Sequence, residues 1–88
     1  MNFYNFMMKN YRQDSGAKGS LALAIHNDRE DFPRNGAGKF SGWRKIMRDY
    51  LERHRIDDSH INAFEECWEE YEQCEKEKAR LRRNSSKR

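Results

Sequence analysis

Large apolar residues recur at helical spacing in four parts of the chain, and the pattern near the C-terminal end organises the rest. Its members follow one another at intervals of three, four and three positions, which places them on one stripe of an α-helix. Glutamates fill most other positions, so this helix has an aromatic inner face and an acidic outer face. Asp57, Asp58 and Ser59 precede it and offer a capping oxygen and negative charge to its N-terminus. The stripe, expected at the centre of the core, consists of Ile61, Phe64, Trp68 and Tyr71.

We expect this helix to begin near Asp58 and to continue to about Arg80. Beyond Tyr71 the apolar stripe ends, and side chains of opposite charge follow at spacings that allow pairing along one helix. Such pairs contribute about 0.2 to 0.5 kcal/mol each. Residues 84–88 are expected to be disordered. The predicted pairs are Glu72 with Lys76, Glu75 with Lys78, and Glu77 with Arg80.

Two further helices are predicted in the first third of the chain. One covers about residues 3–12, with Asn2 in position to cap it, and the other covers about residues 18–27. A Gln-Asp-Ser-Gly cluster separates them, and small residues in the second helix permit a close helix contact. The side chains expected to reach the core from these helices are Tyr4, Met7, Leu21 and Ile25.

The cleanest helical pattern lies between residues 42 and 54, with Ser41 as its expected cap. An irregular connection over residues 28–39 precedes it, because a proline and two closely spaced glycines interrupt regular structure there. Phe32 is expected to anchor this connection on the core. No alternation long enough for a sheet occurs, so the fold prediction is all-α. The expected core residues of this helix are Trp43, Ile46, Tyr50 and Leu51.

Length and composition restrict the chain to one small domain. Its 88 residues are 38% charged and 35% hydrophobic, and a core of that size supplies about 3 to 5 kcal/mol. We therefore predict a compact bundle of four or five helices over residues 1–75, followed over residues 76–88 by a charged helical extension with a basic tail. No segment has the length or composition of a membrane span or a signal peptide, so we expect a cytoplasmic protein.

The two cysteines support the same compartment. Cys67 and Cys74 lie seven positions apart on one predicted helix, a rise of about 10.5 Å. A disulfide tolerates only about 4.4 to 6.8 Å between its α-carbons, so both thiols are expected to be free, as in a reducing compartment.

No constellation of residues predicts a metal site, a cofactor or an enzyme. His26, His54, His60 and the two cysteines lack the spacings of zinc ligands, and no nucleophile has an evident base. Gly36-Ala37-Gly38-Lys39 is not a phosphate-binding P-loop, because the sequence lacks the required first glycine and the final serine or threonine. The turn has two open interpretations: a phosphate contact of the helix-hairpin-helix type, or an ordinary flexible connection.

Charge is strongly segregated along the chain although the net charge is only +3. Residues 1–56 contain eleven Lys and Arg against six Asp and Glu, residues 57–77 contain one against nine, and residues 78–88 contain six and none. The resulting charges of +5, −8 and +6 bear on partners more than on fold.

Two classes of partner are compatible with this distribution. DNA or RNA could bind a basic helix face, although a solvated face without a partner explains the same residues. Alternatively, the acidic C-terminal helix could contact another protein, and opposite charges on two copies could join them head to tail. No small-molecule ligand is indicated. The residues proposed to contact nucleic acid are Lys39, Arg44, Lys45, Arg48 and Arg55.

The order of these motifs resembles the YozE family, small bacterial proteins with a fold similar to the sterile alpha motif. The resemblance covers about residues 3–71 and implies a compact helical bundle without catalytic residues. It leaves the activity open, since sterile-alpha-like folds bind proteins, RNA or DNA. The sequence departs from the family pattern in its paired glycines and in its charged C-terminal extension. The matching motifs are Phe3-Tyr4-x-Phe6-Met7-Met8, Leu21-Ala22-x-x-Ile25-x-x-Asp28, Phe32-Pro33, Ile46 with Tyr50-Leu51, and Phe64-Glu65-x-x-Trp68-x-x-Tyr71.

Overall fold

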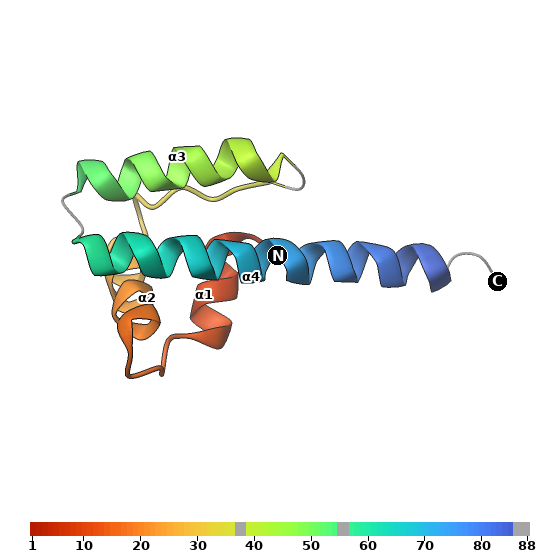
Figure 1. The fold of residues 1–88 in the computed structure, drawn as a ribbon, viewed down its shortest axis with the longest axis horizontal. Coiled ribbons are helices and arrows are strands. Elements are labelled where there is room, and N and C mark those ends of the chain that lie inside the picture. Colours follow the sequence, from red (N-terminus) through yellow and green to blue (C-terminus); the bar gives the residue numbers. More distant parts are fainter. Residues whose placement is uncertain (37–38, 55–56, 86–88) are drawn as a thin grey trace.

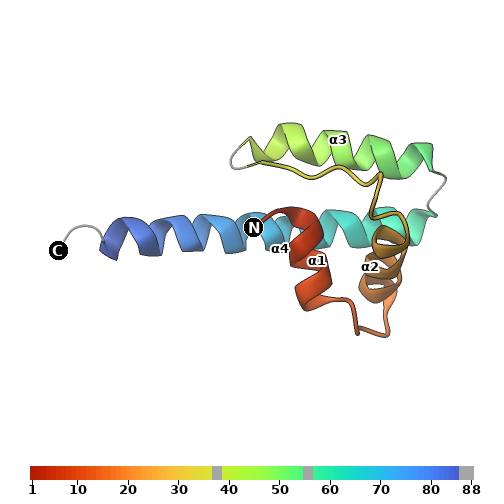
Figure 2. The same cartoon turned by 180° about the vertical axis from the view of Figure 1, so that it is seen from behind.

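The computed structural model describes residues 1–36, 39–54 and 57–85, with side chains described up to Leu81. The described residues form helices and connections without a strand, so the all-α prediction is confirmed. Figures 1 and 2 show α3 antiparallel to the first part of α4, with α1 and α2 against the opposite side of α4. The helices are α1 (Phe3–Asn10), α2 (Ala17–Asn27), α3 (Phe40–Arg53) and α4 (Asp58–Ser85).

Two of the expected helix starts are confirmed by their capping bonds. The Asn2 side chain accepts a hydrogen bond from the Asn5 backbone N–H at 2.8 Å, and Asp57 accepts one from the His60 N–H at 3.1 Å. Each bond satisfies a backbone donor that has no partner within its own helix.

The predicted start of α3 was wrong. The helix begins at Phe40, and the residue before it, Lys39, adopts a left-handed conformation with φ of 53°. Ser41 therefore lies inside the first turn and does not cap the helix. Phe40 contributes to this earlier start because its half-buried ring packs on Tyr71, with ring centroids 6.1 Å apart.

Aromatic side chains from α1 and α4 form the centre of the core. The Trp68 ring lies 5.0 Å from that of Phe3 and 5.1 Å from that of Tyr71, measured between centroids. Sequence patterns placed Met7 in this core but did not select Phe3 or Phe6, both of which are buried. The other expected core residues that are buried are Leu21, Ile25, Phe32, Leu51 and Phe64.

Half-buried residues and one exposed residue complete the set of expected core positions. Tyr4, Trp43, Tyr50 and Ile61 are partly buried and pack against the core, so Ile61 lies at its edge and not at its centre. Ile46 is 48% exposed, so its predicted place in the core was wrong. The reason is that α3 packs on α4 alone among the helices that the structure describes, which covers only part of its apolar stripe.

Two positions that the patterns did not reveal hold the bundle together. The Asn35 side chain is buried, accepts a hydrogen bond from the Phe3 N–H at 2.8 Å and donates one to the Tyr71 hydroxyl at 2.8 Å. Gly19 lies so close to the preceding turn that a Cβ there would stand 1.9 Å from the Asp14 carbonyl oxygen. One residue satisfies buried polar groups, and the other permits close contact between two chain segments.

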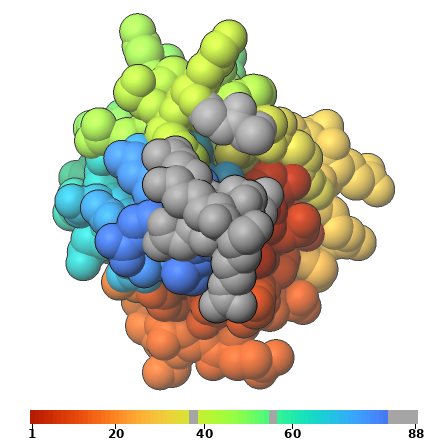
Figure 3. All heavy atoms as spheres, turned by 90° about the vertical axis from the view of Figure 1, so that its right-hand side faces the viewer, coloured from red at the N-terminus to blue at the C-terminus, as the bar shows by residue number. Residues whose placement is uncertain are grey.

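Beyond Tyr71, α4 projects from the bundle as a solvated helix and gives the molecule a longest dimension of 49 Å (Figures 1 and 2). The three predicted charge pairs along it are present, at 3.3 Å, 3.6 Å and 2.9 Å. The helix continues to Ser85 and not to about Arg80, so the expected disorder was wrong for residues 84 and 85, while residues 86–88 lie outside the described chain. Figure 3, which looks along α4 from its C-terminal end, shows α3 on one side and α1 and α2 on the other.

Candidate functional site

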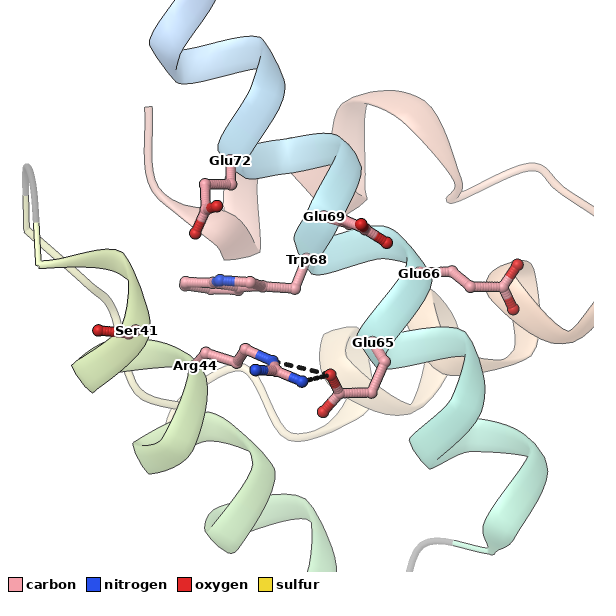
Figure 4. Close-up of a pocket in the computed structure, with 7 residues that line it drawn as sticks. All are labelled: Ser41, Arg44, Glu65, Glu66, Trp68, Glu69 and Glu72. Carbon is pink, nitrogen blue, oxygen red and sulfur yellow. Dashed lines mark hydrogen bonds and ion pairs between the residues drawn. The ribbon is translucent and has the colours of Figure 1, made fainter.

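A groove of about 420 Å³ runs between the first turns of α3 and the middle of α4. The α4 side chains are spaced so that they follow one edge of this helix, next to the aromatic stripe that packs into the core. Figure 4 shows Glu72 on one side of the Trp68 indole and Glu65 paired with Arg44 on the other, while Glu66 and Glu69 point outward from α4. The lining residues are Ser41, Arg44, Glu65, Glu66, Trp68, Glu69 and Glu72.

Trp68 forms the floor of this groove and is only 2% exposed. Its indole lies between the Glu72 carboxylate and the Arg44 guanidinium (Figure 4). Within the described chain, the buried indole N–H has no hydrogen-bond partner. A buried donor without an acceptor costs about 1 to 3 kcal/mol. An acceptor that reached this nitrogen would therefore gain more than an ordinary surface contact.

The groove is acidic. Four glutamates and a single arginine line it, which gives a net charge of −3. Glu65 is already engaged, because it accepts a hydrogen bond from Arg44 Nε at 2.7 Å and lies 3.3 Å from Arg48 Nη1. Glu66 and Glu69 are exposed and have no ion pair with another described residue, so they remain open to an incoming cation.

The five residues proposed for nucleic-acid contact do not lie in one environment. Arg44 and Arg48 face Glu65, and the pKa of Arg48 is raised by its hydrogen bond to Glu52 and by the charge of Glu65. Lys39 and Lys45 are exposed and form no ion pair with the described carboxylates, while Arg55 lies outside the described residues. Of the glycine turn, Gly36 is described and exposed, and Gly38 lies outside the described part.

A second polar cluster ties α1 and α2 to the side of α4. Lys18 Nζ lies 2.7 Å from the Glu70 carboxylate, and the Tyr11 hydroxyl donates to the same carboxylate. Burial and the bond to Glu70 raise the pKa of Tyr11 to about 12, and the bond to Glu70 also raises the pKa of Lys18. Burial raises the pKa of Glu70, but the bonds from Lys18 and Tyr11 outweigh it and leave that pKa lowered. All three groups keep their ordinary charge states near neutral pH, which favours a structural role.

The cysteines and histidines gather into no metal-binding group within the described chain. Both cysteines are free, as predicted. Burial raises the pKa of the Cys67 thiol to about 12, which suppresses the reactive thiolate. Cys74 is half-buried, where the projecting part of α4 begins. None of the described helices combines the length and the apolar character that a membrane crossing requires.

Comparison with known proteins identifies a family and nothing closer. The family model described as YozE SAM-like fold matches residues 2–73, which covers the bundle and leaves the projecting end of α4 outside. Neither the comparison with curated proteins nor the comparison with solved structures produced a match. The aromatic positions that carried the resemblance, among them Phe3, Phe64, Trp68 and Tyr71, form the centre of the core. The chain belongs to the YozE SAM-like family.

Proposed function

We propose that this chain is a non-enzymatic protein-interaction module that binds a positively charged segment of another protein in the groove between α3 and α4. The observation that carries the proposal is the unpartnered N–H of Trp68 at the floor of an acidic groove. A peptide satisfies both features at once, because its backbone carbonyl accepts from the indole while its Lys or Arg side chain pairs with a carboxylate.

The positions of the carboxylates define the expected ligand. Glu66, Glu69 and Glu72 follow one another along α4, so cations spaced along an extended segment can meet Glu66 and Glu69 and compete with Lys76 for Glu72. The indole nitrogen is buried, so the proposal requires that the side chains over it separate to admit an acceptor. Side-chain rearrangement of this kind is common at protein interfaces.

Nucleic acid is the second candidate, and exposed Lys39 and Lys45 are the observation in its favour. The argument against nucleic acid is electrostatic repulsion. Phosphates that approached Arg44 and Arg48 would have to compete with Glu65 and would meet the other groove carboxylates. A basic protein segment meets no such repulsion, which is why we favour it.

The proposal places the module in a bacterial or phage-encoded cytoplasmic setting. Two free cysteines, one of them half-buried, support a reducing compartment. We propose no catalytic role, because the sequence offers no nucleophile with an evident base.

Fluorescence anisotropy with a labelled Arg-Gly repeat peptide tests the proposal. We expect saturable binding that weakens as added salt screens the charges. Glu66→Gln combined with Glu69→Gln should weaken it about tenfold, because two exposed charge pairs contribute together on the order of 1 to 2 kcal/mol. The matched control is Glu30→Gln with Asp31→Asn, which removes the same charge from a connection outside the groove.

Labelled duplex and single-stranded DNA, titrated under the same conditions, separate the two candidates. Equal peptide affinity in the groove variant and the control variant would remove the groove from the proposal. DNA binding that is lost in Lys39→Glu with Lys45→Glu, together with no peptide binding, would favour the second candidate.

A further inference from the structure

We infer that the occupant of the α3–α4 groove is the basic C-terminal segment of a second copy of this chain, residues 78–88, in a head-to-tail contact. The inference rests on the proposed function, because it requires that the groove accept a basic segment. It goes beyond that proposal by naming the partner and the residues on both sides of the contact.

Charge complementarity is the first argument. Residues 78–88 contain six Lys and Arg and no Asp or Glu, whereas the groove carries a net charge of −3. Lys78 and Arg80 have local partners within α4, Glu75 at 3.6 Å and Glu77 at 2.9 Å. The cations of these pairs are exposed, with 42% of the Lys78 side chain and 68% of the Arg80 side chain accessible, so they can exchange these local partners for an intermolecular one.

Helix geometry excludes the same contact within one molecule over the described chain. The groove side chains occupy positions 65–72 of α4, and the helix continues without a break to Ser85. At a rise of about 1.5 Å per residue, position 82 lies roughly 15 Å farther along the axis than position 72, in the direction that leads away from the groove. Figures 1 and 2 show this part of α4 extending past the end of α3. The described cations of this part, Lys78 and Arg80, are therefore accessible to a neighbouring molecule.

The proposed contact joins two different surfaces, so a pair of joined molecules retains one unused groove and one unused basic segment. Such heterologous contacts add further copies without closing unless the rotation between neighbours brings the last copy back to the first. We therefore expect a concentration-dependent series of oligomers and not a single dimer. Because the contact depends on exposed charges, salt should dissociate it.

Sedimentation velocity on the full chain tests the inference, over about 1 μM to 1 mM, the range in which a weak contact dissociates. Two variants each disable one surface: Glu66→Gln with Glu69→Gln in the groove, and Arg82→Gln with Arg83→Gln in the basic segment. Each variant alone should associate at least about tenfold more weakly than the parent chain, since close charge pairs across an interface couple by about 1.5 kcal/mol or more. Glu30→Gln with Asp31→Asn, which removes two charges outside the groove, is the matched control and should associate as the parent does, after circular dichroism has verified that all variants are folded.

Mixing the two disabled variants gives the sharpest result. The groove variant retains an intact basic segment, and the basic-segment variant retains an intact groove, so a mixture forms one good contact and stops at a 1:1 dimer. A symmetric contact or a nonspecific one would not produce this complementation. A parent chain that stays monomeric throughout the concentration range, or a mixture that remains monomeric while the parent associates, would overturn the inference.

The outcome is distinguishable from failure of the proposed function. If the chain is monomeric but the Arg-Gly repeat peptide binds and depends on Glu66 and Glu69, the groove has a foreign partner and only the self-association inference is lost. If the groove variants change neither peptide binding nor association, the proposed function and the self-association inference are both wrong.

Discussion

Helix α4 contains two regions of opposite character, divided at Tyr71. Before that residue, the large side chains of Phe64 and Trp68 are buried among the rings of α1, and the helix direction is set by packing. After it, the side chains are half-buried or exposed, and apart from contacts of Glu75 with the Met1 amine and of Lys76 with the Phe40 ring, their ion pairs join described residues three or four positions apart. One helix therefore serves first as the centre of a core and then as a projecting charged arm.

The comparison separates what stabilises the molecule from what is available to a partner. In a bundle of this size, a few buried rings supply much of the net stability, whereas exposed charge pairs supply little. The projecting region can therefore change in sequence without unfolding the bundle. The boundary between the two regions adjoins the groove, which places the proposed contact where stability and exposure meet.

The largest expected effect comes from Trp68→Ala. Removal of the buried indole should destabilise the fold by about 3 to 5 kcal/mol, enough to leave the domain largely unfolded. Thermal unfolding followed by circular dichroism measures this. Leu81→Ala is the control in the projecting region, where the side chain is 56% exposed, and its midpoint should match the parent. An unfolding midpoint of Trp68→Ala close to that of the parent would contradict the claim that the region before Tyr71 supplies the stability of the bundle.

The two cysteines report on the two regions directly. Cys67 is buried with a pKa raised to about 12, so its alkylation at mildly alkaline pH requires opening of the core, whereas Cys74 is half-buried. If opening costs about 3 to 5 kcal/mol, Cys67 should react on the order of a hundred to a few thousand times more slowly than an unfolded thiol. Mass spectrometry of timed alkylation, with the unfolded chain in denaturant as reference, measures both rates. Similar rates for the two thiols would contradict the division.

A moderate effect is expected from Gly19→Ala, because the added Cβ would meet the Asp14 carbonyl oxygen at 1.9 Å. Forced movement of backbone should cost about 1 to 3 kcal/mol. Gly42→Ala is the matched control, since a Cβ there meets open space within α3 and should stabilise the helix by up to about 1 kcal/mol. Urea unfolding of both variants shows whether each substitution raises or lowers the free energy of unfolding. Equal stabilities would show that the α2 contact with the preceding turn is looser than the structure indicates.

The smallest effect should follow Glu77→Gln, which removes the 2.9 Å pair with Arg80 in the projecting region. We expect a loss of about 0.2 to 0.5 kcal/mol of local helix stability and no measurable change in the unfolding midpoint of the bundle. Circular dichroism of the folded sample measures the loss of helix in the projecting region. The unfolding curve of the same sample measures the stability of the bundle. A shift of the bundle midpoint would show that the arm and the core unfold together.

Sequence patterns succeeded where one physical requirement dominated. Helical periodicity located α1, α2, α3 and α4, because apolar spacing reflects the face that each helix must bury. The caps at Asn2 and Asp57 were predictable because they need only local geometry. Patterns failed at Ile46, whose spacing matches the core stripe but whose exposure depends on how much of α3 a neighbour covers.

Sequence patterns likewise did not predict how the candidate groove is assembled. The glutamates of α4 were identified as an acidic face, and Arg44 and Arg48 as a basic face, but their opposition across one groove follows from the antiparallel packing of α3 on α4. Asn35 likewise bonds to partners 32 and 36 positions away, so no local signal in the sequence marks its role. Phe3 and Phe6 had helical spacing and were open to selection, yet the first helix offered several competing apolar stripes.

By itself the sequence determined the helical class of the fold, the aromatic stripe, the free cysteines and the local charge pairs of the arm, because each depends on residues within a few positions of one another. The tertiary structure alone decided which face of α3 is covered, that Glu65 holds Arg44 and Arg48, and that an unpartnered indole N–H lies in an acidic groove. Those features arise from contacts between distant segments, and burial and pairing are properties of the assembled surface.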